Sequence, residues 1–225
     1  MSEIKRKFPY ADPVLFEHAS TVVSFLPTDI GDFTTYDSTF GQPVIDNLQA
    51  SITTAEATKS DDVIIDELAE LTGIVEQNME NCKEVYKTVA YFARKVYKNN
   101  KAIQNQFGLN DYKKAYNNQA KMIVFMRSLA DTTAKYQADL IAGGMNENVV
   151  TSLPTIQQGL FEANNNQEMF KKQRGKFTQD RVEKMNLLYD QLLPISNAAR
   201  EIYASDPAQL AKYVLPDRPS SDDEE

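Results

Sequence analysis

The sequence predicts an all-α protein, an elongated up-and-down helical bundle with a long central antiparallel helix pair and additional N-terminal helices. Its 225 residues include only 8 Gly and 9 Pro, and sheet proteins need more turn-forming residues than this. From residue 61 to residue 106 there is no Pro, and apolar residues recur at alternating steps of three and four. This 3.5-residue repeat is typical of helices that pack side by side at shallow angles.

A first helix is expected over residues 12–26. Asp12 favours a helix start because its side chain can cap free N–H groups, and Pro13 fits the first turn because it has no N–H to leave unpaired. Pro27 follows and should end the helix, so we expect the stretch 28–40 to be irregular.

A second helix is expected over 43–59, and the long central helix over 61–106. If unbroken, the central helix would be roughly 65–70 Å long at about 1.5 Å per residue. Asn78 and Asn99 occupy the two positions of its seam that are not apolar. The apolar seam positions are Ile64, Leu68, Leu71, Val75, Cys82, Val85, Val89, Phe92, Val96 and Ile103.

A fourth helix is expected over 111–142, between a turn at Phe107-Gly108-Leu109 and a stop at Gly143-Gly144. The connection before it is short, which predicts that it lies antiparallel to the central helix.

The remainder predicts two further helices and a short terminal turn. The fifth helix is expected from Ser152 to about Arg174, and a turn at 175–177 should separate it from the sixth. The sixth should be kinked at Pro194. Asp206-Pro207 should start a last helical turn that ends near residue 213.

We expect one domain, because the long central helix would tie both halves of the chain to a single core. The domain should cover residues 1–215. Residues 216–225 form an acidic tail without apolar side chains to hold it, so we expect it to be disordered.

The formal net charge is −8, which argues against a general nucleic-acid binder, because phosphate neutralisation needs a cationic face. No apolar run is long enough for a transmembrane helix. The N-terminal residues lack the pattern of a secretory signal, and a single cysteine excludes an internal disulfide framework. These features predict a soluble, cytoplasmic protein.

Two residues of reactive type, His18 and Cys82, are interpreted as structural. His18 is the only histidine, and no Glu-x-x-His spacing accompanies it, although metal sites in helical bundles require such ligands one turn apart. Cys82 lies on the apolar seam, where a thiol packs as a small apolar group. We therefore expect no cofactor, no metal site and no catalytic residue.

Four polar residues are expected at core positions of the bundle: Asn78, Asn99, Gln119 and Gln137. A polar residue on a helix seam can fix helix register or oligomeric state, which is the interpretation we prefer. The alternative is a polar cavity that holds a ligand.

A set of short motifs lies between about residue 60 and residue 216: Tyr91-Phe92, Asn99-Asn100, Phe107-Gly108, Asp111-Tyr112, Met122 with Phe125-Met126, Thr178-Gln179, Ala198-Ala199, and Tyr213 with Leu215-Pro216. In this pattern the sequence resembles a family of uncharacterised helical bacterial proteins of about the same length, for which no activity is known. The resemblance implies a helical bacterial protein and transfers no functional residue.

No specific biochemical function can be read from the sequence. The preferred hypothesis is a non-enzymatic structural or protein-interaction helical bundle, because a long helix rod offers a large lateral surface to another protein or to a second copy of the chain. One alternative is a membrane-acting protein that uses the apolar first helix. Another is a binder of a small ligand, or an enzyme, with a polar pocket near Asn78 and Gln119.

Overall fold

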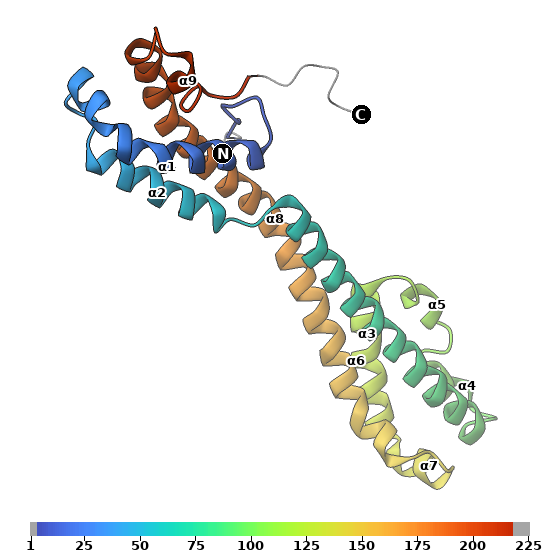
Figure 1. Cartoon of the computed structure of the whole chain (residues 1–225). Coiled ribbons are helices and arrows are strands. Elements are labelled where there is room, and N and C mark those ends of the chain that lie inside the picture. The colour runs from blue at the N-terminus through green and yellow to red at the C-terminus, as the bar shows by residue number, and fades with distance from the viewer. Residues whose placement is uncertain (1–3, 218–225) are drawn as a thin grey trace. The chain divides into compact units, whose positions relative to one another are not determined.

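The computed structural model of this protein describes residues 4–217. Throughout those residues it contains helices, turns and no β-strand, which confirms the all-α class. Part of the predicted disordered tail, 218–225, lies outside the described residues. The helices are α1 (Asp12–Tyr36), α2 (Gln42–Glu56), α3 (Asp61–Val96), α4 (Lys101–Gln106), α5 (Tyr112–Ala115), α6 (Gln119–Lys135), α7 (Gln137–Ala142), α8 (Glu147–Ile202) and α9 (Pro207–Leu210) (Figure 1).

The chain packs into two compact units. Unit 1 comprises Met1–Asp61 and Arg174–Glu225, and unit 2 comprises Asp62–Gln173. Unit 2 is thus an insertion between the two halves of unit 1, and each unit has its own hydrophobic core. The sequence did not reveal this division, and a single helical bundle domain over residues 1–215 stays a prediction.

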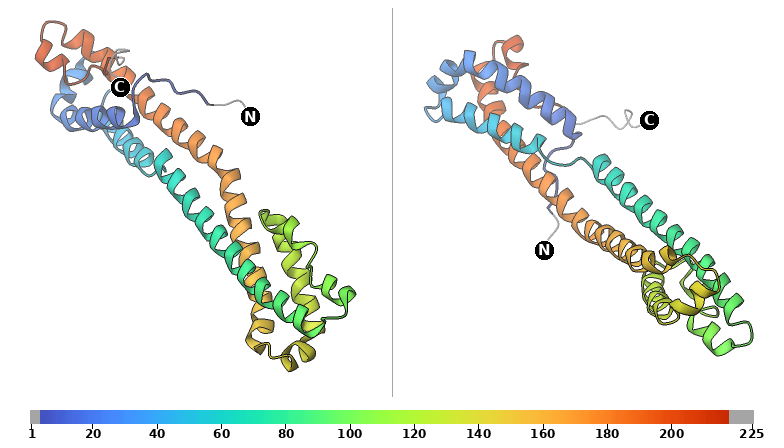
Figure 2. Two further views of the ribbon diagram at one scale, coloured as in Figure 1. Left: turned by 90° about the vertical axis from the view of Figure 1, so that its right-hand side faces the viewer. Right: turned by 90° about the horizontal axis from the view of Figure 1, so that it is seen from below.

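Unit 1 is built from α1, α2, α9 and the C-terminal part of α8. In both views of Figure 2, α1 and α2 lie side by side with that part of α8. Leu15 and Val22 of α1, Leu48 of α2 and Leu188 of α8 are completely buried in its core. This is the burial that the 3.6-residue spacing of apolar side chains predicts for packed amphipathic helices.

The expected end of the first helix at Pro27 is wrong, because α1 continues to Tyr36 with Pro27 inside it. A proline in a helix removes one backbone hydrogen bond and costs about 3 kcal/mol. Packing beyond the proline offsets this cost. Phe33 is completely buried, and its ring contacts those of Tyr203 and Tyr213.

The long antiparallel pair of unit 2 consists of α3 and the N-terminal part of α8, which lie side by side in both views of Figure 2. The Gln167 amide donates a 2.8 Å hydrogen bond to the Thr72 hydroxyl, and further along the pair Gly159 lies against Asn78. Residue numbers fall on α8 while they rise on α3, as an antiparallel pair requires.

The segment predicted as the fourth helix does not lie antiparallel to α3. Rings of Tyr86 and Phe125 are in contact, and so are those of Tyr97 and Tyr136, so residue numbers rise together on α3 and α6. The chain reaches this direction because the residues between α3 and α6, including α4 and α5, return it toward the middle of α3 (Figure 1).

Two asparagines divide helices that we predicted as continuous. The central helix ends at Val96 instead of residue 106, and the Asn100 side chain accepts the N–H of Ile103 to cap α4. The fourth helix is divided into α5, α6 and α7, and Asn118 caps α6 by accepting the N–H of Lys121. An asparagine side chain competes for backbone hydrogen bonds, so it favours helix starts over helix interiors.

Conversely, the fifth and sixth helices are one helix, α8, which passes through the expected turn at Gly175. A glycine within a helix costs only about 1 kcal/mol, which is less than the burial of apolar residues on either side can provide. The final turn, α9, forms as predicted, with the Asp206 side chain accepting N–H groups of Ala208 and Gln209.

Candidate functional site

A hollow in unit 2 lies along one face of α6. It has a volume of about 580 Å³, and we call it the α6 pocket. One wall is formed by residues 105–108 together with Asp111, Lys114 and Ala115. Its floor consists of the α6 residues Ala120, Lys121, Val124, Phe125, Ser128 and Leu129.

Gly108 brings the wall of the α6 pocket close to its floor. Its φ of +72° is a left-handed conformation that side chains with a Cβ rarely adopt. A Cβ atom there would also lie 2.3 Å from Cε2 of Phe125, so only glycine allows the Phe125 ring to occupy this place. The Tyr86 hydroxyl contacts the Gly108 carbonyl oxygen at 3.4 Å and ties the turn to α3.

A cluster of aromatic side chains connects the pocket to α3. The Tyr86 and Tyr112 rings are stacked with centroids 3.8 Å apart, and Phe125 contacts both rings. Burial, with smaller contributions from nearby groups, raises the pKa of Tyr112 to about 12. Burial also raises the pKa of Tyr86, although the neighbouring Arg94 opposes this shift. Both hydroxyls therefore stay protonated at neutral pH.

The rim of the α6 pocket carries positive charge. Lys114 forms an ion pair of 2.8 Å with Asp111, and this contact raises the pKa of Lys114. Lys121 also lines the pocket and forms no ion pair within residues 4–217. The floor carries an exposed apolar side chain as well, since Val124 is 67% exposed.

The pocket belongs to a strongly basic part of the chain. Between residues 83 and 135 the only acidic residues are Glu84, Asp111 and Asp131. The whole chain has a net charge of −8, so positive charge is concentrated in this segment while the rest is acidic. The basic residues of the segment are Lys83, Lys87, Arg94, Lys95, Lys98, Lys101, Lys113, Lys114, Lys121, Arg127 and Lys135.

The four predicted polar core residues do not line this pocket. Asn78 and Gln119 are partly buried, whereas Asn99 and Gln137 are exposed. Asn99 lies in the turn after α3, and Gln137 is the first residue of α7, because the two predicted long helices end there. The prediction that Asn99 and Gln137 lie in the core is therefore wrong.

The two residues interpreted as structural lie inside the protein. Cys82 is completely buried, and burial raises the pKa of its thiol to about 11. His18 is partly buried, and burial lowers its pKa. Both shifts favour the uncharged form, as expected of side chains packed in apolar surroundings.

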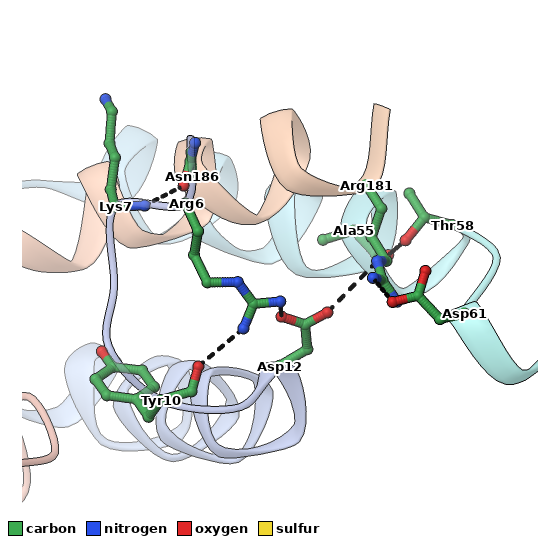
Figure 3. A network of polar contacts seen from close by, with 9 residues as sticks. All are labelled: Arg6, Lys7, Tyr10, Asp12, Ala55, Thr58, Asp61, Arg181 and Asn186. Carbon is green, nitrogen blue, oxygen red and sulfur yellow. Dashed lines mark hydrogen bonds and ion pairs between the residues drawn. The ribbon is translucent and has the colours of Figure 1, made fainter. Parts of the chain in front are cut away.

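A second polar cluster, in unit 1, fixes the N-terminal segment (Figure 3). Asp12 forms an ion pair of 2.6 Å with Arg6. Arg181 of α8 forms ion pairs with both Asp12 and Asp61. The buried Asn186 side chain accepts the N–H of Lys7. These residues come from segments far apart in the sequence, so no local pattern could have identified them.

Asn186 binds this segment through both ends of its amide. Its Nδ2 atom donates to the carbonyl of Lys5 at 2.8 Å, and its Oδ1 atom accepts the N–H of Lys7 at 2.8 Å. Phe8 and Tyr10 follow and are buried in the core of unit 1. The cluster thus holds the segment that precedes α1 against α8.

Comparison with protein families, with curated proteins and with solved structures finds no match to this chain. Within residues 4–217, no helix combines the length and the apolar character needed to cross a membrane. In the same residues no group of three or more His, Cys, Asp or Glu side chains could hold a metal ion. The α6 pocket offers an apolar, partly exposed lining from which a function can be argued.

Proposed function

We propose that this chain is a non-enzymatic protein-interaction helical bundle that binds its partner through the α6 pocket. The observation that carries the proposal is the apolar floor of the pocket, where Val124 is 67% exposed and where Lys114 and Lys121 are also lining residues. An apolar centre with a polar rim is the common arrangement of protein interfaces.

Site-specific photo-crosslinking tests this proposal. A photoreactive amino acid is placed at Val124 of the full chain and, as a matched control, at Met169 of α8, which is 58% exposed and outside the pocket. After irradiation in an extract of the native host, we expect a discrete protein adduct from position 124 and none from position 169. Equal adducts from both positions, or none from position 124, would contradict the proposal.

Light scattering of the purified chain then distinguishes self-association from binding of another protein. If the partner is a second copy, the Val124→Arg variant should be monomeric where the wild-type chain is oligomeric, and Met169→Arg should behave like the wild type. If the partner is another protein, both variants and the wild type should have the same mass.

A small-ligand binder is the second candidate, because pockets of about 300–1,000 Å³ are typical of ligand sites and the α6 pocket falls within this range. This would place a ligand in the α6 pocket instead of in a polar pocket near Asn78 and Gln119, which was an alternative interpretation of the sequence. Co-purified small molecules identified by mass spectrometry, lost in Val124→Arg and kept in Met169→Arg, would favour this candidate.

The membrane-acting alternative has less support. Leu15, Ala19, Val22 and Leu26 of α1 are completely buried in unit 1, so the helix would have to leave its core before it could meet a lipid surface. Contact of residues 14–26 with a membrane stays a prediction, and cosedimentation with neutral and anionic vesicles measures it.

A further inference from the structure

The floor of the α6 pocket has the form of a seat for a helix. Two rows of side chains along α6 form this floor. Such rows on a helix surface are ridges between which the side chains of a second helix pack, at an axial separation of about 8–10 Å. From its first to its last residue the floor is about 14 Å long at ~1.5 Å per residue, so a docked helix would contact it over roughly two and a half turns. The two rows are Ala120, Val124, Ser128 and Lys121, Phe125, Leu129.

One of the two lysines that line the pocket has no counter-charge in the described residues. Lys121 lies in the first turn of α6, where the positive end of the helix dipole disfavours a cation. Lys121 forms no ion pair within residues 4–217, whereas Lys114 is paired with Asp111. A carboxylate from a partner would therefore meet favourable potential at this rim.

The wider surroundings favour the same sign of partner. Residues 83–135 carry basic side chains far in excess of acidic ones, within a chain of net charge −8. Charge segregation of this kind directs association, because a positive patch attracts negative partners and repels positive ones. A second copy of this chain would have to present an acidic part of its surface to fit.

We propose that the α6 pocket receives an acidic amphipathic helix of a partner protein. Its apolar side chains contact Val124 and Phe125, and its carboxylates lie beside Lys114 and Lys121. This inference rests on the proposed function and specifies the chemistry of the partner.

The observations favour a protein helix over the two other anionic partners. Nucleic-acid phosphates need cationic contacts along a surface, and they would leave the apolar floor around Val124 without a matching group. A lipid surface fits a protruding apolar patch, whereas the apolar residues here line a hollow. An amphipathic helix satisfies the apolar floor and the cationic rim together.

Fluorescence anisotropy with the full chain tests the inference. The probe is a labelled peptide with leucines at i, i+3, i+4 and i+7 and glutamates on the flanking positions. Two matched peptides replace either the glutamates by lysines or the leucines by serines. We expect measurable binding of the Glu/Leu peptide only, weakened by added salt because the rim charges are exposed.

Variants of the chain locate the binding. Lys121→Glu and Lys114→Glu should each weaken binding of the Glu/Leu peptide by about tenfold, since each reverses a rim charge. Lys172→Glu, an equal charge change on an exposed residue of α8 outside the pocket, should leave it unchanged. Circular dichroism confirms that each variant keeps the helical fold.

Each other outcome overturns the inference. If the lysine peptide binds as well as the glutamate peptide, or if no peptide binds while Val124 still crosslinks to a protein, the partner is not an acidic helix and the proposed function stands. If single-stranded oligonucleotide or anionic vesicles bind through Lys121 and no peptide does, both the inference and the proposed function are wrong.

Discussion

Asn78 of α3 lies directly against Gly159 of α8, so that a Cβ atom at position 159 would be 2.8 Å from the Asn78 Oδ1 atom. The Asn78 amide is held there because its Nδ2 atom donates to the carbonyl of Ile74 at 2.8 Å. A polar seam residue of one helix thus meets a glycine of the antiparallel helix. This is a residue-specific contact that sliding of the two helices would break.

Replacement of Gly159 by alanine should destabilise unit 2. The added methyl group overlaps the Asn78 Oδ1 atom, so the Asn78 side chain has to shift. Insertion of a methyl group into a packed contact typically costs about 1–3 kcal/mol, and we expect this cost to exceed the gain of about 0.5–1 kcal/mol that alanine brings to a helix interior. Urea unfolding followed by circular dichroism measures the change in free energy of unfolding. In the Asn78→Ala background the same substitution should cost less, because the overlapping atom is gone, and an equal cost in both backgrounds would show that the contact is unimportant.

Gly175 provides the matched control. Nothing lies within 4 Å of a Cβ atom at this position, which is inside α8. Gly175→Ala should therefore stabilise the chain by about 0.5–1 kcal/mol, the ordinary gain for a helix interior. A loss of stability would mean that α8 is not a regular helix at this point.

Gly108→Ala should affect both the stability of unit 2 and the α6 pocket. The left-handed φ of +72° costs about 1 kcal/mol or more for alanine, and the methyl group would displace the Phe125 ring. We expect a lower free energy of unfolding together with weaker binding of the Glu/Leu peptide described above. Gly73→Ala, on a helix with nothing within 4 Å, should not weaken peptide binding.

Asn186→Leu should release the segment before α1 while the rest of unit 1 stays folded. The substitution removes the hydrogen bonds to the backbone of Lys5 and Lys7, and trypsin cleaves after such basic residues. We expect faster cleavage near the N-terminus, measured by mass spectrometry over time. Gln191→Leu, which removes the 2.8 Å bond to Ser51 instead, should leave this cleavage rate unchanged.

Alkaline pH should weaken unit 1 through Tyr203 and Tyr213. Burial and hydrogen bonds to Asp32 and Asp29 raise the pKa of both phenols above the ordinary value of 10.0. A raised pKa in the folded state means that the folded chain holds more protons than the unfolded chain above pH 10.0. The contribution of these groups to the free energy of unfolding is therefore fully present and independent of pH below pH 10.0, and it is lost as the pH rises beyond that value.

The variant with Tyr203→Phe and Tyr213→Phe separates this effect from general alkaline denaturation. At neutral pH it should be less stable, by about 1–3 kcal/mol per lost hydrogen bond to a carboxylate. Between pH 10.0 and the wild-type unfolding midpoint its stability should change less steeply with pH than that of the wild type. If the free energy of unfolding, measured with urea at each pH, falls equally steeply in the variant and the wild type, Tyr203 and Tyr213 do not cause the loss of stability.

The fold class could be predicted from the sequence because it depends on patterns within each segment. The seam of α3, the buried Cys82 and the cap at Asp206 all follow from local spacing and local hydrogen bonds. Helix boundaries failed where distant contacts outweighed local preference. Pro27 is tolerated because Phe33 is buried against Tyr213, which is far away in the sequence.

The candidate site could not be predicted for a related reason. The α6 pocket depends on the return of the chain near Gly108 and on the parallel direction of α6, neither of which has a periodic signature. The excess of basic residues over acidic ones in residues 83–135 can be counted in the sequence, but the net charge of −8 for the whole chain conceals it. A net charge calculated by segment would have drawn attention to this region.

The insertion of unit 2 into unit 1 has a consequence for biosynthesis. The helices α1 and α2 leave the ribosome first, but their core also requires Leu188 and Leu192 of α8. At about 5–20 residues per second, translation of the intervening segment takes on the order of ten seconds. During this interval the apolar faces of the nascent N-terminal helices lack their final cover, so a chaperone that binds exposed apolar helices would meet this chain before its synthesis is finished.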